Sequence, residues 1–309
     1  MDQVAKKMEK RLTRLDWILL LGLAALACCV FRIFDFSIDY QWNWSVIPQY
    51  FFRFDRVKNE WIPNLLIQGL YTTIRISIWS SILAMIIGTV MGMVIRSNSL
   101  YLRILVRTYV ELVRNTPPLV LIFIFYFFLG NQLIALLGVD SFISSQSKQT
   151  KHILGILFAE EAQFSAFLSA LLTMAIYEGA YMTEIIRAGL ASVPKGQWEA
   201  ADAIGLDYWK KFRLVILPQA FRVILPALTG QFISTIKDSA VVSVISIQEL
   251  TFQGMELMSA TYLTFEIWIT ITLMYFTLTG ICSLGASRLE KRMRKNQFEL
   301  KTFDTRNRN

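Results

Sequence analysis

The chain has 309 residues, of which 54% are hydrophobic and 17% are charged, and its formal net charge is +8. Average soluble domains carry about 25% charged residues, so the composition excludes a disordered chain and argues against a soluble two-domain enzyme. His152 is the only histidine, and the three cysteines lie in apolar runs without the spacing of a disulfide framework or zinc site. We therefore expect no metal site and no histidine-based catalytic residue.

Long apolar stretches dominate the chain. A helix needs about 20 predominantly apolar residues to cross the hydrocarbon core of a membrane. Six stretches meet or nearly meet this length, and they are Trp17–Phe34, Leu65–Ile95, Leu119–Val139, Ala162–Ile186, Arg222–Gln248 and Tyr262–Ser287. The fifth is the weakest, because Lys237 and Asp238 interrupt it. The sequence predicts an all-α membrane protein with about six transmembrane helices.

The distribution of Lys and Arg predicts the orientation of these helices. Residues 1–16, 95–114 and 187–222 and the tail from Arg288 together carry 23 basic residues, whereas the alternate loops carry five. Cytoplasmic loops are enriched in Lys and Arg, so both termini are expected in the cytoplasm. The positive charge is thus a topology signal, and we expect no nucleic-acid partner.

This orientation divides the chain into five parts. Residues 1–16 form a basic cytoplasmic N-terminus, 17–34 an N-terminal transmembrane helix, and 35–64 an external segment. Residues 65–290 form the main membrane bundle, and 291–309 a cytoplasmic tail.

A cytoplasmic segment between the fourth and fifth stretches, residues 195–218, is predicted to form two short helices, and we call it the coupling elbow. The first helix, over 197–204, is rich in alanine, and Gly205 is placed to end it in a left-handed cap. Asp207 can cap a second helix over 208–217, which Pro218 closes or bends. The small side chains would let a partner approach the first helix closely, while Glu199 and Asp202 offer acidic contacts. An amphipathic loop resting on the lipid surface is an equally weighted alternative.

Among the charged residues inside the apolar stretches, we single out Arg75, Glu178, Lys237 and Asp238. A charge at the bilayer centre costs about 2.5–3.5 kcal/mol on insertion scales, so these side chains are expected to face the protein interior or water. They could line a translocation path for a substrate with charges of both signs, or only pair between helices and hold the bundle together. Gly88 and Gly92 have the spacing of a close helix–helix contact, and Pro117-Pro118 is expected to start the third helix.

Several short sequence motifs resemble those of a known protein family. Glu199-Ala200-Ala201, Gly205 and Ile216-Leu217-Pro218 resemble the EAA loop of permease subunits of ATP-binding-cassette (ABC) importers. Further words resemble the polar-amino-acid branch of that family, and they are Gly69–Ser77, Glu111–Leu119, Glu178–Arg187, Val193–Gln197, Leu217–Ala220 and Ile236–Ser239. The resemblance covers roughly residues 62–290 in register, so the first apolar stretch lies outside it.

The resemblance implies a five-helix type I importer permease core, to which the N-terminal helix is an addition. It implies a transport subunit of the bacterial inner membrane without enzymatic activity, because the chain has no P-loop sequence for ATP. A separate ATPase subunit would use ATP and Mg²⁺ and would dock on the elbow through Gln197, Glu199, Ala200, Ala201, Ala203 and Gly205. Other expected partners are a second permease copy or sibling, an extracytoplasmic solute-binding protein and membrane lipid. An ion- or proton-coupled secondary amino-acid carrier is the alternative, and an intramembrane enzyme that uses an acid pair of Glu178 and Asp238 is a weaker one.

Overall fold

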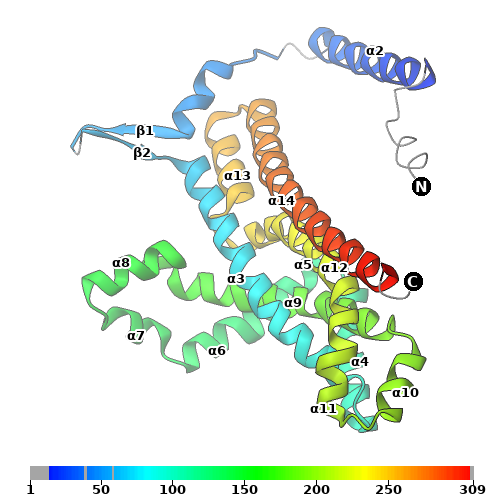
Figure 1. The fold of residues 1–309 in the computed structure, drawn as a ribbon. Helices are drawn as coiled ribbons and strands as arrows, with labels where there is room; N and C mark the ends of the chain where they lie inside the picture. Colours follow the sequence, from blue (N-terminus) through cyan, green and yellow to red (C-terminus); the bar gives the residue numbers. More distant parts are fainter. Residues whose placement is uncertain (1–13, 38–39, 58, 307–309) are drawn as a thin grey trace. The chain divides into compact units, whose positions relative to one another are not determined.

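The computed structural model describes residues 14–37, 40–57 and 59–306, which form two separate units (Figure 1). The first unit ends at Trp44, and its main element is helix α2, Arg14–Ser37. This helix contains the predicted first span, but its apolar stretch Trp17–Leu26 is shorter than a membrane crossing requires. A transmembrane role for α2 therefore stays a prediction. Most of the predicted basic N-terminus lies outside the described residues.

The second unit contains five helical segments that are long and apolar enough to cross a membrane. They are Leu65–Val94, Pro118–Leu136, Glu161–Ala191, Tyr208–Ile245 and Thr264–Arg288. The first is helix α3, the third is mainly α9 (Phe164–Ala191), and the fifth is the first part of α14 (Thr264–Arg306). Five of the six predicted stretches are thus confirmed as candidate spans.

Two of these spans contain a turn of π-helix. The second span consists of α5 (Pro118–Ile124), η3 (Phe125–Gly130) and α6 (Asn131–Leu136). The fourth consists of α11 (Tyr208–Lys210), η5 (Lys211–Ile216), α12 (Leu217–Asp238) and the 3-10 segment η6 (Ser239–Ile245). Pro118 stands at the first position of α5, as predicted for a helix start.

Of the two outcomes predicted for Pro218, closing the second elbow helix or bending it, the first was wrong. Pro218 lies in the first turn of α12, and the helical path continues through it from Tyr208 to Ile245. A proline inside a helix removes one hydrogen bond and clashes with the carbonyl four residues earlier. The π-helical turn η5 ends just before Pro218. Because π-helical turns pair residues five apart, this wider turn accommodates the missing N–H and the clash of the proline ring. The fifth predicted span therefore begins at Tyr208 rather than at Arg222.

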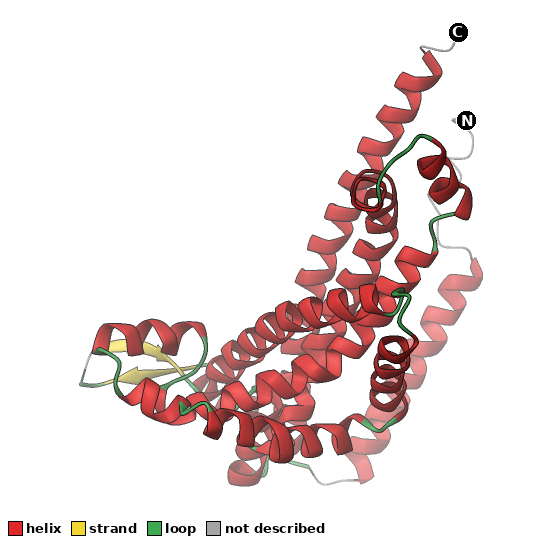
Figure 2. Cartoon of the chain, turned by 90° about the horizontal axis from the view of Figure 1, so that it is seen from below, coloured by secondary structure: helices red, strands yellow, loops and turns green. Residues whose placement is uncertain are grey.

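Shorter elements connect the spans. A 3-10 helix, η2 (Trp44–Tyr50), precedes a hairpin of β1 (Phe52–Asp55) and β2 (Glu60–Pro63), in which Phe52 pairs with Pro63 and Asp55 with Glu60. Figure 2 shows this hairpin beside an otherwise helical chain. The remaining helices are α4 (Leu100–Asn115), α7 (Val139–Ser144), α8 (Lys148–Leu157), α10 (Lys195–Ala203) and α13 (Leu250–Thr261), with the 3-10 turn η4 (Glu161–Gln163) before α9.

The α3–α9 pair is the central contact of the bundle, and glycines make it close. A Cβ atom added at Gly88 would lie 2.5 Å from the Cβ of Met182 and 2.9 Å from the backbone nitrogen of Thr183. At Gly92 an added Cβ would lie 2.8 Å from Cγ2 of Ile186. The predicted small-residue contact is confirmed, since only a residue without a side chain lets the two backbones approach this closely.

Candidate functional site

Helix α10 forms the first half of the coupling elbow, as predicted. It follows Pro194 and ends at a Schellman motif, in which Gly205 N–H donates to the Asp202 carbonyl and Leu206 N–H to the Ala201 carbonyl. Gly205 has φ +72°, the left-handed conformation that glycine adopts without steric cost. In the next turn Asp207 accepts a 2.8 Å bond from Lys210 N–H, which confirms its predicted capping role and holds the pKa of its carboxyl below the ordinary value.

An aromatic side chain fixes α10 to the rest of the bundle. The ring of Trp198 lies between two cations, with the Arg96 guanidinium 4.9 Å and the Lys211 ammonium 5.8 Å from its centre. Arg96, just beyond α3, also donates to the Leu190 carbonyl of α9 at 2.9 Å. Lys211 forms an ion pair with Asp202. The elbow is therefore tied to the ends of both α3 and α9.

The predicted coupling residues divide into exposed and buried groups. Gln197, Glu199, Ala200, Ala203 and Gly205 are exposed, whereas Ala201 is 2% exposed and faces the bundle. Gln197 also accepts a 3.0 Å bond from the Gln219 amide. Ile204, which follows α10 in the chain, is also exposed, and so are Tyr208 and Trp209 at the start of the fourth span. The exposed side chains of α10 are therefore accessible to another subunit.

The four intramembrane charges do not converge on one point. Glu178 is fully buried on α9, where its Oε2 accepts a 2.8 Å bond from the Gln231 amide, and it lies close to the Asp238 carboxyl, while its Oε1 has no hydrogen-bond partner among the described residues. Lys237 is exposed, and it takes part in none of the ion pairs formed within the described part of the chain. The structure therefore brings Glu178 and Asp238 together and leaves Lys237 apart. Whether these three side chains line a substrate path stays a prediction.

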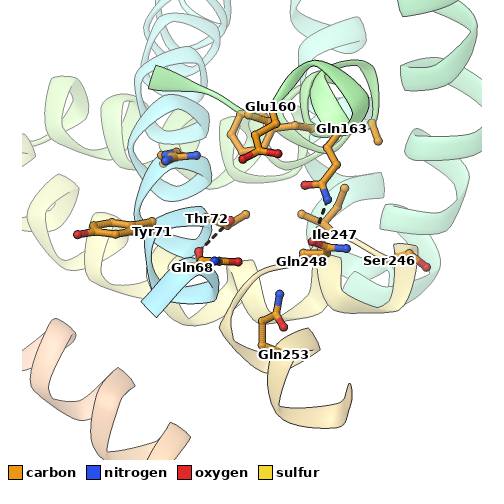
Figure 3. A pocket seen from close by; sticks show the side chains of 13 residues that line it. Gln68, Tyr71, Thr72, Glu160, Gln163, Ser246, Ile247, Gln248 and Gln253 are labelled. Carbon is orange, nitrogen blue, oxygen red and sulfur yellow. Dashed lines mark hydrogen bonds between the residues drawn. The ribbon is translucent and has the colours of Figure 1, made fainter. Parts of the chain in front are cut away.

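Arg75 lies elsewhere, in the wall of a cavity of about 270 Å³ near the start of α3 (Figure 3). One of its N–H groups donates to the Phe158 carbonyl at 3.2 Å. The walls come from α3, from the segment around η4, from the turn after η6 and from α13. The lining is mostly polar, and besides Arg75 its polar members are Gln68, Tyr71, Thr72, Glu160, Gln163, Ser246, Gln248 and Gln253.

A buried carboxylate holds α13 against this cavity. Glu249 is fully buried and caps α13 by accepting a 2.7 Å bond from Phe252 N–H, and it accepts a second 2.7 Å bond from the Tyr275 hydroxyl. The Thr73 hydroxyl of α3 also bonds to it. Burial raises the pKa of the Glu249 carboxyl, and these donors stabilise its charged form. The network joins α3, α13 and α14.

Sequence reasoning missed the cavity, the Glu249 network and the clamp on Trp198. Glu160 and Gln163 lie around η4, whereas Gln248 and Gln253 lie just before and within α13, and no sequence spacing relates the two groups. A concentration of glutamines next to the apolar stretches was the one signal that could have drawn attention to them. Trp198 was visible in the elbow, but its partner Arg96 lies about 100 residues earlier in the chain.

Comparison with known proteins places the chain in a family. Residues 62–295 match the family model described as the inner membrane component of binding-protein-dependent transport systems. The glutamine transport system permease of Escherichia coli K12 is 31% identical over 74% of this chain and 93% of its own length. The L-cystine transport system permease of Bacillus subtilis is 32% identical over 77% of this chain and 90% of its length.

Solved structures agree with these relatives. An amino acid ABC transporter crystallised with histidines has a TM-score of 0.62 at 29% identity, with 82% of this chain and 100% of that chain covered. A methionine ABC transporter in an inward-facing conformation has a TM-score of 0.54 at 18% identity, which shows a shared fold. These matches do not favour the alternative of a secondary carrier. The chain is a multi-pass inner-membrane protein, and it belongs to the family of permease subunits of binding-protein-dependent ABC transport systems.

Proposed function

We propose that this chain forms one half of the membrane channel of an ATP-driven importer, and that the importer moves a polar amino acid into the cell. The relatives are named for glutamine, L-cystine and, in Escherichia coli, glutamate and aspartate, all of which are polar zwitterions. The channel is completed by a second copy of the chain or by a sibling permease. A solute-binding protein delivers the amino acid from outside, and both termini face the cytoplasm, as the distribution of basic residues supports.

The observation that carries the coupling part of this proposal is the clamped yet exposed helix α10. Its inner side is fixed by Trp198 and Ala201, while Gln197, Glu199, Ala200 and Ala203 remain accessible. An ATPase subunit that binds ATP and Mg²⁺ docks on this face. Because α10 is tied to α3 and α9, a displacement of the ATPase moves both spans together with the elbow.

Transport then follows from a change in population between two arrangements of the bundle. ATP closes the ATPase dimer, and the two elbows of the permease pair move with it. The ATP-bound motor must bind the outward-facing arrangement more tightly than the inward-facing one, because a ligand with equal affinity for both shifts nothing. The binding protein releases its amino acid into the outward-facing path, and hydrolysis resets the elbows.

Two substitutions in the elbow test this proposal. Glu199→Arg reverses a charge on the docking face, and Gly205→Val puts a branched side chain at φ +72°, where it is strained. Both should reduce ATP-dependent amino-acid uptake and co-purification of the ATPase subunit. Glu256→Gln, an exposed carboxylate on α13, serves as the control and should change neither. Unaltered uptake by the elbow variants, with no ATPase in the purified complex, would contradict the proposal.

A further inference from the structure

The cavity beside Arg75 has the size of a small-molecule site. Drug-sized ligands occupy pockets of roughly 300–1,000 Å³, and this one encloses about 270 Å³. Water takes up roughly 30 Å³ per molecule, so the space corresponds to on the order of ten non-hydrogen atoms. Figure 3 shows polar side chains from four segments around this space. A free amino acid fits a space of this size.

The cavity presents two opposite charges. Arg75 is half-buried in its wall and has five guanidinium N–H donors, one of which bonds to the Phe158 carbonyl. Glu160 stands in the same wall and attracts Arg75 electrostatically, although these two described side chains form no ion pair. A cation and an anion that line one cavity without forming an ion pair with each other can each bind the opposite charge of a ligand. The α-carboxylate and α-ammonium of an amino acid supply such a pair.

A buried amide supplies a third contact. Gln253 is 3% exposed and lines the cavity, and its Oε1 is buried away from the open space without a hydrogen-bond partner among the described residues. The Nε2 of the same amide donates no hydrogen bond to the described residues, so it is available to an acceptor of a ligand in the cavity. Gln163 and Gln248 instead pair with each other at 2.8 Å.

The backbone is built to place Gln253 there. A Cβ atom added at Gly69 would lie 2.8 Å from Cγ of Gln253 and 3.0 Å from Cα of Leu250. Only glycine allows α13 to approach α3 so closely, and the Glu249 network described above fixes this approach. The position of the Gln253 amide is therefore determined by the close approach at Gly69 and by the hydrogen bond between Thr73 and Glu249.

We propose that this cavity is a binding subsite for a zwitterionic amino acid whose side chain is neutral and carries a hydrogen-bond acceptor. Arg75 binds the α-carboxylate, Glu160 binds the α-ammonium, and the Gln253 amide N–H donates to the side chain. The inference rests on the proposed function, since it names the substrate class of that importer.

Charge balance gives the subsite its selectivity. With Arg75 and Glu160 the wall is neutral, so a ligand with an additional charge leaves that charge without a partner in the cavity. Glutamine should therefore bind more tightly than glutamate or arginine. Removing the negative charge of Glu160 should shift the preference toward glutamate, and removing the positive charge of Arg75 should shift it toward arginine.

The test measures binding to the purified chain in lipid nanodiscs, with whatever subunits co-purify and without the solute-binding protein. The probes are radiolabelled L-glutamine, L-glutamate and L-arginine. Glu160→Gln should lower the preference for glutamine over glutamate about tenfold, and Arg75→Gln should do the same for glutamine over arginine. Gln253→Met should weaken glutamine binding and leave the binding of alanine, a fourth probe, unchanged. The matched control is Glu161→Gln, because Glu161 adjoins Glu160 but pairs with Lys151 at 2.7 Å and does not line the cavity.

Two results would overturn the inference. One is saturable binding whose selectivity is the same in wild type and in the Glu160, Arg75 and Gln253 variants. The other is the absence of saturable binding by the wild-type chain. Uptake by whole cells separates these results from a failure of the proposed function. ATP-dependent uptake of an amino acid that all three pocket variants leave unchanged would refute the subsite alone, whereas a wild-type importer that takes up no amino acid would refute both.

Discussion

The close contact between α3 and α9 gives a quantitative prediction for Gly88→Ala. The new Cβ would lie 2.5 Å from the Cβ of Met182 and 2.8 Å from its carbonyl carbon. Carbon atoms in good contact are about 3.5–4.0 Å apart, so the two helices must separate by about 1 Å. Overpacking of this kind costs about 1–3 kcal/mol, while alanine recovers about 1 kcal/mol of helix propensity relative to glycine.

Two other glycines provide a graded comparison. At Gly92 the nearest atom is Cγ2 of the Ile186 side chain at 2.8 Å, so Gly92→Ala can be relieved by a side-chain shift and should cost less. At Gly280, in α14, nothing lies within 4 Å of an added Cβ, so Gly280→Ala gains helix propensity without a clash. We expect Gly280→Ala to be the most stable of the three variants, Gly92→Ala to be intermediate, and Gly88→Ala to be the least stable.

The apparent melting temperature of the purified protein in detergent measures this order. Each sample is heated for the same time, and the monodisperse fraction is read from size-exclusion chromatography. A difference of 1–3 kcal/mol between Gly88→Ala and Gly280→Ala corresponds to about 2–4 °C for each kcal/mol. If Gly88→Ala melts at or above Gly280→Ala, the helices tolerate the methyl group and the contact is not as tight as the backbone geometry requires.

Two further substitutions test the contacts that position the sites. Trp198→Leu removes the ring between Arg96 and Lys211, and cation–π contacts are worth about 0.5–1 kcal/mol each at exposed positions. We expect the ATPase subunit still to co-purify with Trp198→Leu, while uptake per ATP hydrolysed falls. Trp198→Phe keeps an aromatic ring and should be less affected. Equal uptake per ATP in the two variants would argue against a role for the contacts of the ring with Arg96 and Lys211. In Glu249→Gln, the amide N–H₂ replaces a carboxylate oxygen that accepts hydrogen bonds from neighbouring donors. A donor that loses its acceptor in this way lowers the stability of the fold by about 1–3 kcal/mol. Hydrogen exchange of α13 should rise in this variant, and an unchanged exchange pattern would show that the network does not hold α13.

Much of the fold could be predicted from the sequence, because a membrane leaves few choices. Every backbone polar group in the bilayer must be paired within the chain, so long apolar stretches become helices. Gly205 was predictable for a similar reason, since a glycine after an alanine-rich helix is the usual left-handed cap. The Gly88–Gly92 spacing likewise indicated a close contact before the partner helix was known. These features depend on neighbouring residues alone.

The cavity could not be predicted, because it depends on contacts between distant residues. Gln68 and Gln253 are 185 positions apart, and they meet only because α13 turns back against α3 at Gly69. The start of the fourth span was misplaced for a different reason. Pro218 ordinarily interrupts a helix, and the π-turn that accommodates it leaves no sequence signature as clear as the proline itself.

The geometry of α3 and α9 connects the two proposed sites. The cavity lies near the start of each helix, at Arg75 on α3 and at Gln163 just before α9, and the elbow is fixed near their other ends through Arg96 and Leu190. From Arg75 to the end of α3 at Val94 is about 28 Å at 1.5 Å per residue. Because the glycine contacts pack the two helices too closely to slide, a displacement of the elbow must reach the cavity as a movement of the pair. Gly88→Ala should therefore lower transport beyond its effect on the amount of folded protein, since it weakens the contact that makes the two helices one unit.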